Sequence, residues 1–305
     1  MNQDKPLVGV ALMIGFCVMA PLLDVCAKLA AAEIPVAEIT VFRFVVQALL
    51  MMPICLYFGG KLLAPRKDFA ILAVRAACLL AATFCFIAAI RLMPIADALA
   101  IVFVEPFLIL LMGKFFLGEQ VGMRRMVACG VGFVGVLMVI QPSFAAFGPV
   151  ALFPLATAVT FAAYLLVTRK LSGRMSPVSM QYHTAVFGAV MAIALVGLAQ
   201  WMPFRPASFD LVMPQGVFWL LLFGVGAFAS ISHMMVTVAL RYAPSATLAP
   251  LHYLELISAG FFGYIVFGDF PNNLALWGIG IILLAGLYCI YRERVTSKEM
   301  AGAQA

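Results

Sequence analysis

The sequence contains very little charge. Only 10% of its 305 residues are Asp, Glu, Lys or Arg, whereas 65% are hydrophobic, and the mean hydropathy is +1.11. Soluble globular domains carry about 25% charged residues. The composition therefore excludes a soluble domain and indicates a protein whose surface faces a lipid bilayer.

The sequence also lacks the motifs of disulfide frameworks, metal centres and nucleotide sites. Its seven cysteines form no C-x-x-C pair and all fall in apolar segments, where we expect them to pack as small apolar side chains. His183, His233 and His252 lie in three different apolar segments without an H-E-x-x-H motif, so no metal site is expected. The glycines of a G-x-G-x-x-G match at 130–135 favour close helix packing over a dinucleotide site. No cofactor is predicted.

Ten apolar segments are long enough to cross a bilayer, which takes about 20 mostly apolar residues per helix. Turn-forming Gly and Pro residues separate them. The first should stay in the membrane, because no charged leader with a small-residue cleavage site precedes it. The sequence thus predicts an all-α integral membrane protein with ten transmembrane helices. The predicted spans are 7–28, 36–58, 69–91, 95–117, 124–142, 149–170, 178–200, 215–240, 244–267 and 274–291.

The distribution of Lys and Arg predicts the orientation, because cytoplasmic loops retain an excess of these residues. With the amino terminus inside, the outer ends keep only Lys28, Arg91 and Arg205, and the other cations at span ends fall inside. We therefore expect both termini in the cytoplasm. The net charge of +6 is explained in this way, so no nucleic-acid partner is predicted.

The two halves of the chain resemble each other. At a shift of 150 residues, AIRLMPIADALAIVFVEPF at 89–107 aligns with ALRYAPSATLAPLHYLELI at 239–257, which pairs Glu105 with Glu255. Earlier parts of the halves match at a shift of 142. Each copy holds five spans, an odd number, so the second copy must be inverted, as in many secondary transporters. The predicted units are 1–145 and 146–295, followed by a cytoplasmic tail at 296–305.

Glu105 and Glu255 fall near the middle of predicted spans. A charged group at a helix centre costs roughly 2.5–3.5 kcal/mol, so we expect both side chains to face the bundle interior or a wet cavity. Pro106 and Pro250 each free one backbone carbonyl nearby, which suits the binding of a cation or a proton. The alternative is that each glutamate only clamps a neighbouring helix or an arginine.

Further charged residues are candidates for the site or for gates. Arg43 and Arg75 lie inside spans of the first half, and their repeat partners are apolar. Ion pairing with Glu105 or Asp24 is the favoured role for them. The alternative is that they bind a substrate carboxylate or phosphate, and Arg75 is the preferred candidate partner for a carboxylate. Asp24 and Lys28 are spaced i, i+4 and favour a salt bridge or an outer gate. Helix-end caps or gates are expected at Glu119 and Asp269.

Aromatic and histidine side chains complete the set of candidates. His252 lies one turn before Glu255 on the same helix face and is a candidate helper to it. Aromatic side chains such as Tyr164, Phe84 and Trp219 are candidates for a box around a cation or a flat ring, although most aromatics in such a chain pack helices or meet lipid.

The repeated segments resemble the EamA-type drug/metabolite transporters. The resemblance covers about residues 7–292 and rests on VFRFVVQALL, AVRAACLLAATF and the two aligned segments, which are followed by LGE and FGD. It implies an inner-membrane carrier with a central cavity, lined mostly by the first, third, fourth, sixth, eighth and ninth helices. Asp269 departs from the repeat, where a glutamate is expected.

We therefore predict a secondary transporter that moves a small polar metabolite by alternating access, with possible proton coupling. An amino acid, an amine or a related zwitterion or cation is the favoured substrate. The rivals are a membrane-embedded enzyme, for which no nucleophile or metal motif is visible, and a non-transporting membrane subunit. The sequence leaves monomer and homodimer open.

Overall fold

The computed structural model of the chain describes residues 6–93, 95–118, 123–140, 148–204 and 206–268, together with scattered positions between 274 and 291. Every element in these ranges is helical, and none of the described residues is in a strand. Six helical segments are long and apolar enough to cross a membrane. The chain is thus a multi-pass, all-helical membrane protein, as the composition predicted. Only scattered positions of the predicted tenth span are described.

The long helices match the predicted spans closely. They are α1 (Pro6–Ala30), α2 (Val36–Tyr57), α3 (Phe69–Leu92), α8 (Leu152–Ser172), α9 (Pro177–Gln200) and α10 (Val217–Tyr242). The shorter ones are α4 (Ile95–Val102), α5 (Glu105–Leu117), α6 (Met123–Ile140), α11 (Ser245–Leu248) and α12 (Leu254–Phe267). Single 3₁₀ turns are η1 (Arg66–Asp68), η2 (Gly148–Ala151), η3 (Ala207–Phe209) and η4 (Ala249–Tyr253).

Helix ends follow local sequence chemistry. At the start of α9, the Ser176 hydroxyl accepts a hydrogen bond from the Ser179 amide, and Pro177 occupies the first turn, where its missing N–H costs nothing. Gly118 after α5 and Gly268 after α12 adopt left-handed conformations with φ of 66° and 76°. Glycine reaches this region without a steric penalty, so both helices stop there.

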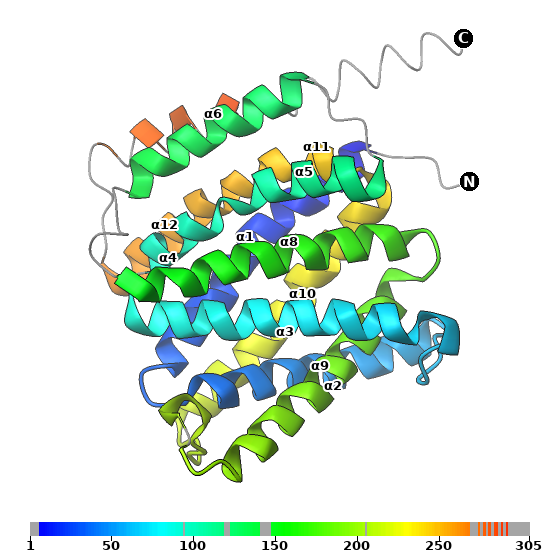
Figure 1. Cartoon of the computed structure of the whole chain (residues 1–305), viewed down its shortest axis with the longest axis vertical. Helices are drawn as coiled ribbons and strands as arrows, with labels where there is room; N and C mark the ends of the chain where they lie inside the picture. Colours follow the sequence, from blue (N-terminus) through cyan, green and yellow to red (C-terminus); the bar gives the residue numbers. More distant parts are fainter. Residues whose placement is uncertain are drawn as a thin grey trace.

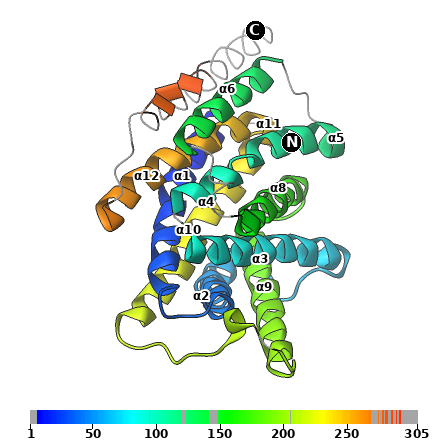
Figure 2. The ribbon, with the colours of Figure 1, turned by 60° about the vertical axis from the view of Figure 1, so that its left-hand side comes forward.

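Helices of the two halves pack against each other rather than forming separate domains. The layer of α1, α3, α8 and α10 lies between α2 with α9 on one side and the α4, α5, α11 and α12 segments on the other, with α6 at the edge (Figures 1 and 2). The pairing is reciprocal: α1 packs along α10 as α8 packs along α3, and α12 packs on α1 as α5 packs on α8.

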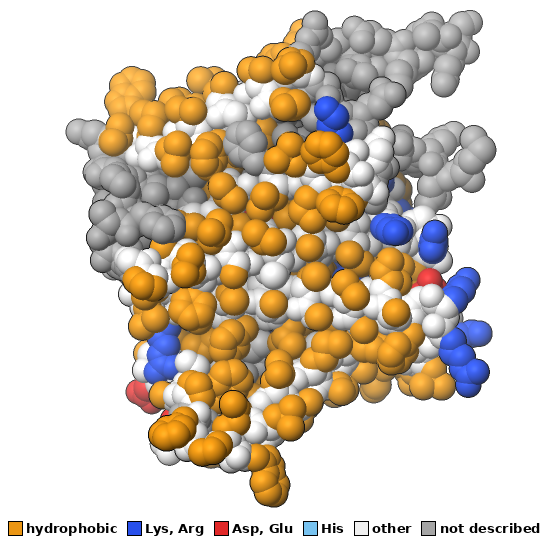
Figure 3. Space-filling model, viewed as in Figure 1, with side chains coloured by type: hydrophobic (Ala, Val, Ile, Leu, Met, Phe, Trp, Pro, Cys, Tyr) orange, Lys and Arg blue, Asp and Glu red, His pale blue; other side chains and the backbone are white. Residues whose placement is uncertain are grey.

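The outer surface suits a lipid environment. Large apolar side chains are exposed on many helices, including Phe115, Leu198 and Leu220. Figure 3 shows a broad face covered by hydrophobic side chains, with Lys and Arg gathered mainly at its right-hand end. Such a surface would aggregate in water and is stable in hydrocarbon.

Glycine allows two close approaches that matter for the interior. An added Cβ at Gly188 of α9 would come within 2.3 Å of the Phe44 ring of α2, and one at Gly132 of α6 within 2.4 Å of the Tyr253 ring. Gly132 belongs to the G-x-G-x-x-G match, and its place against Tyr253 accords with the packing role expected from the sequence. The Phe44 ring in turn lies under the Arg43 guanidinium, 4.5 Å from ring centre to Cζ.

Replacing Gly188 by alanine should destabilise the protein by about 1–3 kcal/mol, because Phe44 is fully buried and cannot retreat without repacking. Thermal unfolding of the purified protein in detergent, followed by intrinsic fluorescence, measures the effect. Gly197→Ala on the same helix is the matched control, since a Cβ there meets nothing within 4 Å. Equal unfolding temperatures for the two variants would contradict the close packing of α2 on α9.

Candidate functional site

The fourth helical segment of each half is interrupted at its glutamate. In the first half, α4 ends at Val102, two turn residues follow, and α5 begins at Glu105. In the second half, α11 and η4 precede α12, which begins one residue before Glu255. The predicted spans 95–117 and 244–267 are therefore not continuous helices. Pro106 and Pro250 explain the breaks, because a proline removes a helical hydrogen bond and its ring clashes with the preceding turn.

Both glutamates consequently lie in the first turn of a new helix. The first N–H groups of a helix have no partner within it, and the helix dipole is positive at this end. The positive end of the dipole acts in favour of a carboxylate at these positions. Discontinuous helices at membrane depth are tolerated only where protein or a wet cavity covers the freed backbone groups.

A cavity lies where the two broken segments meet. Its volume is about 90 Å³, and its polar lining is Asp24, Arg43, Glu105, His233 and Glu255, with Thr83 and Thr157. The remaining lining is apolar and aromatic. The structure thus brings Glu105, Glu255, Asp24 and Arg43 to one cavity. It is lined by α1, α3, α4, α5, α8, α10 and α12, as the resemblance implied, and also by α2 through Arg43.

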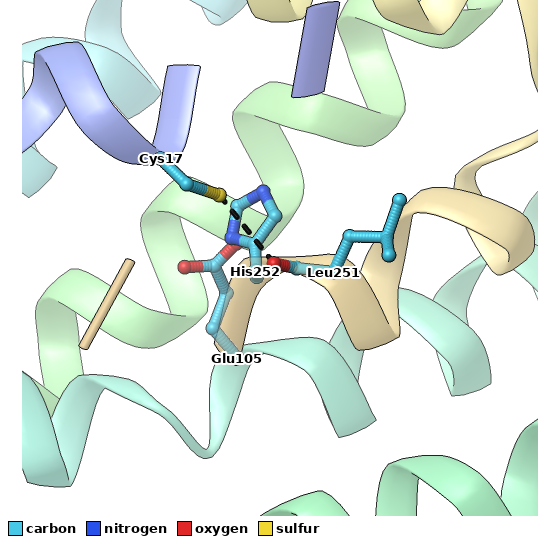
Figure 4. A network of polar contacts seen from close by, with 4 residues as sticks. All are labelled: Cys17, Glu105, Leu251 and His252. Carbon is cyan, nitrogen blue, oxygen red and sulfur yellow. Dashed lines mark hydrogen bonds and ion pairs between the residues drawn. The ribbon is translucent and has the colours of Figure 1, made fainter. Parts of the chain in front are cut away.

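Glu105 and His252 lie against each other beneath the cavity. The His252 Nδ1 is 3.3 Å from the Glu105 Oε1, without the geometry of a hydrogen bond. Figure 4 shows the two side chains meeting between η4 and α5, with Cys17 of α1 close by. The Cys17 thiol donates to the Leu251 carbonyl over 3.4 Å, which ties α1 to the 3₁₀ turn that carries His252. His252 therefore approaches Glu105 of the other repeat, in addition to being Glu255's neighbour in sequence.

Arg43 is buried at the cavity wall and only partly paired. Its Nη2 donates to the His233 Nε2 over 2.8 Å. Because a guanidinium can only donate, His233 must accept through Nε2 and carry its proton on Nδ1, which lies 3.3 Å from the Tyr164 hydroxyl. Arg43 is 1% exposed, and neither its Nε nor its Nη1 has a hydrogen-bond partner among the described residues.

Arg75 lies in a different environment, away from the cavity. Its five N–H groups face six neutral acceptors on three helices, and its Cζ lies 4.6 Å from the centre of the Tyr164 ring. The acceptors are Thr168 (2.8 Å) and Tyr164 (2.9 Å) of α8, Gln181 (3.0 Å), the Met180 carbonyl (3.2 Å) and Thr184 of α9, and Thr237 (3.2 Å) of α10. These contacts leave no donor for Glu105, for Asp24 or for a ligand.

The other candidate residues are distributed around the site. Tyr164 is fully buried between Arg75 and His233 rather than at the cavity. Phe84 lines a separate apolar pocket between α2, α3 and α9. Trp219 is 45% exposed, with its ring 5.6 Å from that of Phe42. The Lys28 ammonium lies 5.2 Å from the centre of the Phe267 ring. Glu119 and Asp269 lie outside the described residues.

Two phenylalanines that sequence reasoning did not single out line the cavity. Phe16 of α1 and Phe161 of α8 stack at 6.5 Å between ring centres, and both pack against the rings of His233 and His252. Together they form an aromatic floor suited to a flat ring or a cation. The signal was present in the sequence: both are aromatics near mid-depth on the first helix of their repeat unit.

A multi-pass helical protein with two broken helices, whose acidic residues face one central cavity, belongs to the class of membrane transporters. The chain matches the EamA-like transporter family twice, over residues 7–141 and 148–292. It therefore belongs to this family, within the drug/metabolite transporter superfamily, and is a transporter rather than an enzyme.

The individual relatives have low sequence identity to this chain. The chain is 28% identical to an S-adenosylmethionine uptake transporter of Rickettsia bellii, over 89% of both chains. It is 26% identical to a riboflavin transporter of Brucella anthropi, over 87% of this chain and 91% of the relative. A solved crystal structure matches 96% of this chain and 100% of its own, with a TM-score of 0.74 and 18% identity, which supports the fold alone.

Replacing Arg75 by lysine should lower the stability of the protein by at least about 2 kcal/mol, because an ammonium has only three donors for the six acceptors around Arg75. Thermal unfolding in detergent measures the loss. Arg91→Lys is the matched control, since Arg91 is exposed in the last turn of the same helix. An Arg75→Lys variant as stable as the control would show that the hydrogen bonds from the guanidinium group are dispensable for stability.

Proposed function

We propose that the chain is a secondary transporter of the bacterial inner membrane, built from ten helices in two inverted five-helix repeats. The reciprocal packing of α1 on α10 and of α8 on α3 supports this arrangement, as does the double family match. Both termini are cytoplasmic in this proposal. In support, α1 begins at the end of the molecule where Lys and Arg gather (Figures 1 and 3).

The cavity position fits alternating access from the outer side. In the proposed orientation, Asp24, Arg43 and Ile87 of its lining belong to the outer halves of their helices. The Arg75 contacts with α8, α9 and α10 lie in the inner halves, where Arg169 also donates to the Leu240 carbonyl over 2.7 Å. In this proposal the conformation is an outward-facing state closed on the inside, and these contacts would have to break when the inner side opens.

The carboxyl groups and aromatic rings of the cavity favour a cationic or zwitterionic metabolite. Asp24, Glu105 and Glu255 outnumber Arg43, so the cavity has an excess of acidic groups. Phe16 and Phe161 offer a face for a flat ring. S-adenosylmethionine and riboflavin, the substrates in the relatives' names, each contain a fused heteroaromatic ring. Ring-bearing amines, amino acids and related zwitterions are therefore the proposed substrate class.

One observation carries the proposal: two carboxyl groups from pseudo-symmetric broken helices face one cavity. Glu105 is 3% exposed, and its Oε1 contacts the His252 Nδ1 at 3.3 Å without the geometry of a hydrogen bond, so the carboxyl group keeps the capacity to bind a cation or a proton. If a cationic substrate and a proton cannot bind to Glu105 and Glu255 at the same time, substrate transport is coupled to proton movement.

Replacing Glu105 by glutamine should reduce substrate flux about tenfold or more, because the amide keeps the shape but loses the charge-assisted contact. The flux of S-adenosylmethionine, riboflavin and a set of amino acids and amines is measured in proteoliposomes with and without an imposed pH gradient. The wild type should respond to the gradient, and Glu105→Gln should not.

Glu33→Gln serves as the control, since Glu33 is exposed in the turn after α1. Flux of a tested metabolite that ignores both the gradient and the Glu105 substitution would point to a facilitator without proton coupling. A wild type that moves none of these compounds, although it folds, would favour the non-transporting subunit.

A further inference from the structure

The two buried arginines differ in how their hydrogen-bonding capacity is used. Arg75 has every donor directed at a neutral acceptor. Arg43 is equally buried, yet its Nε and Nη1 have no partner among the described residues, and it lines the cavity. Buried charged donors without partners are rare because desolvation is not compensated. The unfilled donors of Arg43 therefore mark a position where a ligand supplies the acceptors.

The guanidinium is held in place for such a ligand. Its Nη2 donates to His233 and its plane packs on the Phe44 ring, so the group is ordered before any ligand arrives. Nη2 carries two hydrogens and uses one of them for His233. A carboxylate can therefore contact two nitrogens at once, through the second Nη2 hydrogen and either Nε or Nη1.

The charges around Arg43 narrow the class of ligand. Asp24, which interacts electrostatically with Arg43, and the glutamates Glu105 and Glu255 line the same cavity. A simple anion would meet these three carboxyl groups, and a simple cation would meet the guanidinium. A ligand with a carboxylate and at least one cationic group satisfies both poles of the cavity.

Arg43 has no matching arginine in the second half of the chain. The residue that corresponds to Arg43 in the second half is Ala185, whereas Glu105 corresponds to Glu255. A ligand held by its carboxylate at Arg43 can therefore bind in one orientation, with its cationic part toward the pair of glutamates.

From the contrast between the two arginines, we infer that Arg43 is the carboxylate anchor of the transport site, and that the substrate is a zwitterion whose carboxylate is required for binding. The inference rests on the proposed transport function. It assigns to Arg43 the role that the sequence had suggested for Arg75.

Matched pairs of compounds test the inference, each consisting of a zwitterion and its decarboxylated form. Suitable pairs are S-adenosylmethionine with decarboxylated S-adenosylmethionine, L-tryptophan with tryptamine, L-histidine with histamine and L-arginine with agmatine. Binding is measured by calorimetry on the purified protein and flux by counterflow in proteoliposomes. The wild type should prefer the carboxylate member of the pairs that it binds by about tenfold or more.

Arg43→Gln should lower affinity for the carboxylate member about tenfold or more and change that for the amine by less than about threefold. Arg43→Lys should fall between, because an ammonium contacts a carboxylate at one point only. Arg91→Gln, an exposed charge on α3, is the matched control and should leave the preference intact. If Arg43→Gln fails to fold, the wild-type preference and the Arg43→Lys variant still decide the matter.

Three results would overturn the inference while leaving transport intact. The first is a wild type that binds and moves the amine as well as its zwitterion. The second is a carboxylate preference that persists in Arg43→Gln. The third is recovery of Arg43→Gln by the added Asp24→Asn change, which would show that Arg43 only neutralises Asp24. A folded wild type that neither binds nor moves any compound of the metabolite panel would instead overturn the proposed function, and the inference with it.

Discussion

A backbone group in hydrocarbon must find its hydrogen-bond partner inside the protein, and this constraint decides where the helices of this chain can be interrupted. The breaks before Glu105 and Glu255 would be costly against lipid. They are tolerated because α1, α3, α8 and α10 surround them and a cavity lies between. The prolines that cause the breaks thus also fix where the acidic side chains enter the interior, and the site follows from the packing of the layer around it.

Two arginines of the first half show how the same side chain serves different ends in this interior. Arg75 joins α3 to α8, α9 and α10 through neutral acceptors, so its charge is dispersed without a carboxylate. Arg43 keeps donors open at the cavity. The hydroxyl of Tyr164 is shared between the two regions, since it accepts from Arg75 and lies beside the His233 ring that Arg43 contacts. The cavity and the inner contacts are therefore physically continuous.

The sequence was sufficient for the long helices, because hydropathy determines them, and the internal repeat pointed to Glu105 and Glu255, which line one cavity. It could not identify the partners of Arg75, which come from residues 89 to 162 positions away and are ordinary Thr, Tyr and Gln side chains. Nor could the sequence distinguish aromatic side chains that line the cavity from those that do not. Phe84 and Phe16 have the same polarity, and an apolar face turned to the interior looks like one turned to the bilayer.

In the proposed mechanism, two similar halves would give the chain two nearly equivalent ways of closing around the centre, as alternating access requires. Equivalence alone cannot hold an asymmetric molecule in one orientation. The two halves differ at positions that could distinguish the two ends of a ligand. Arg43 corresponds to Ala185, and His233 corresponds to Thr83. Arg43 and His233 contact each other at the cavity, where the Arg43 Nη2 donates to the His233 Nε2, whereas Glu105 has a matching glutamate in the second half. In the proposed site, the paired glutamates would receive the cationic part of the substrate, and the unpaired Arg43 would fix the end that carries the carboxylate.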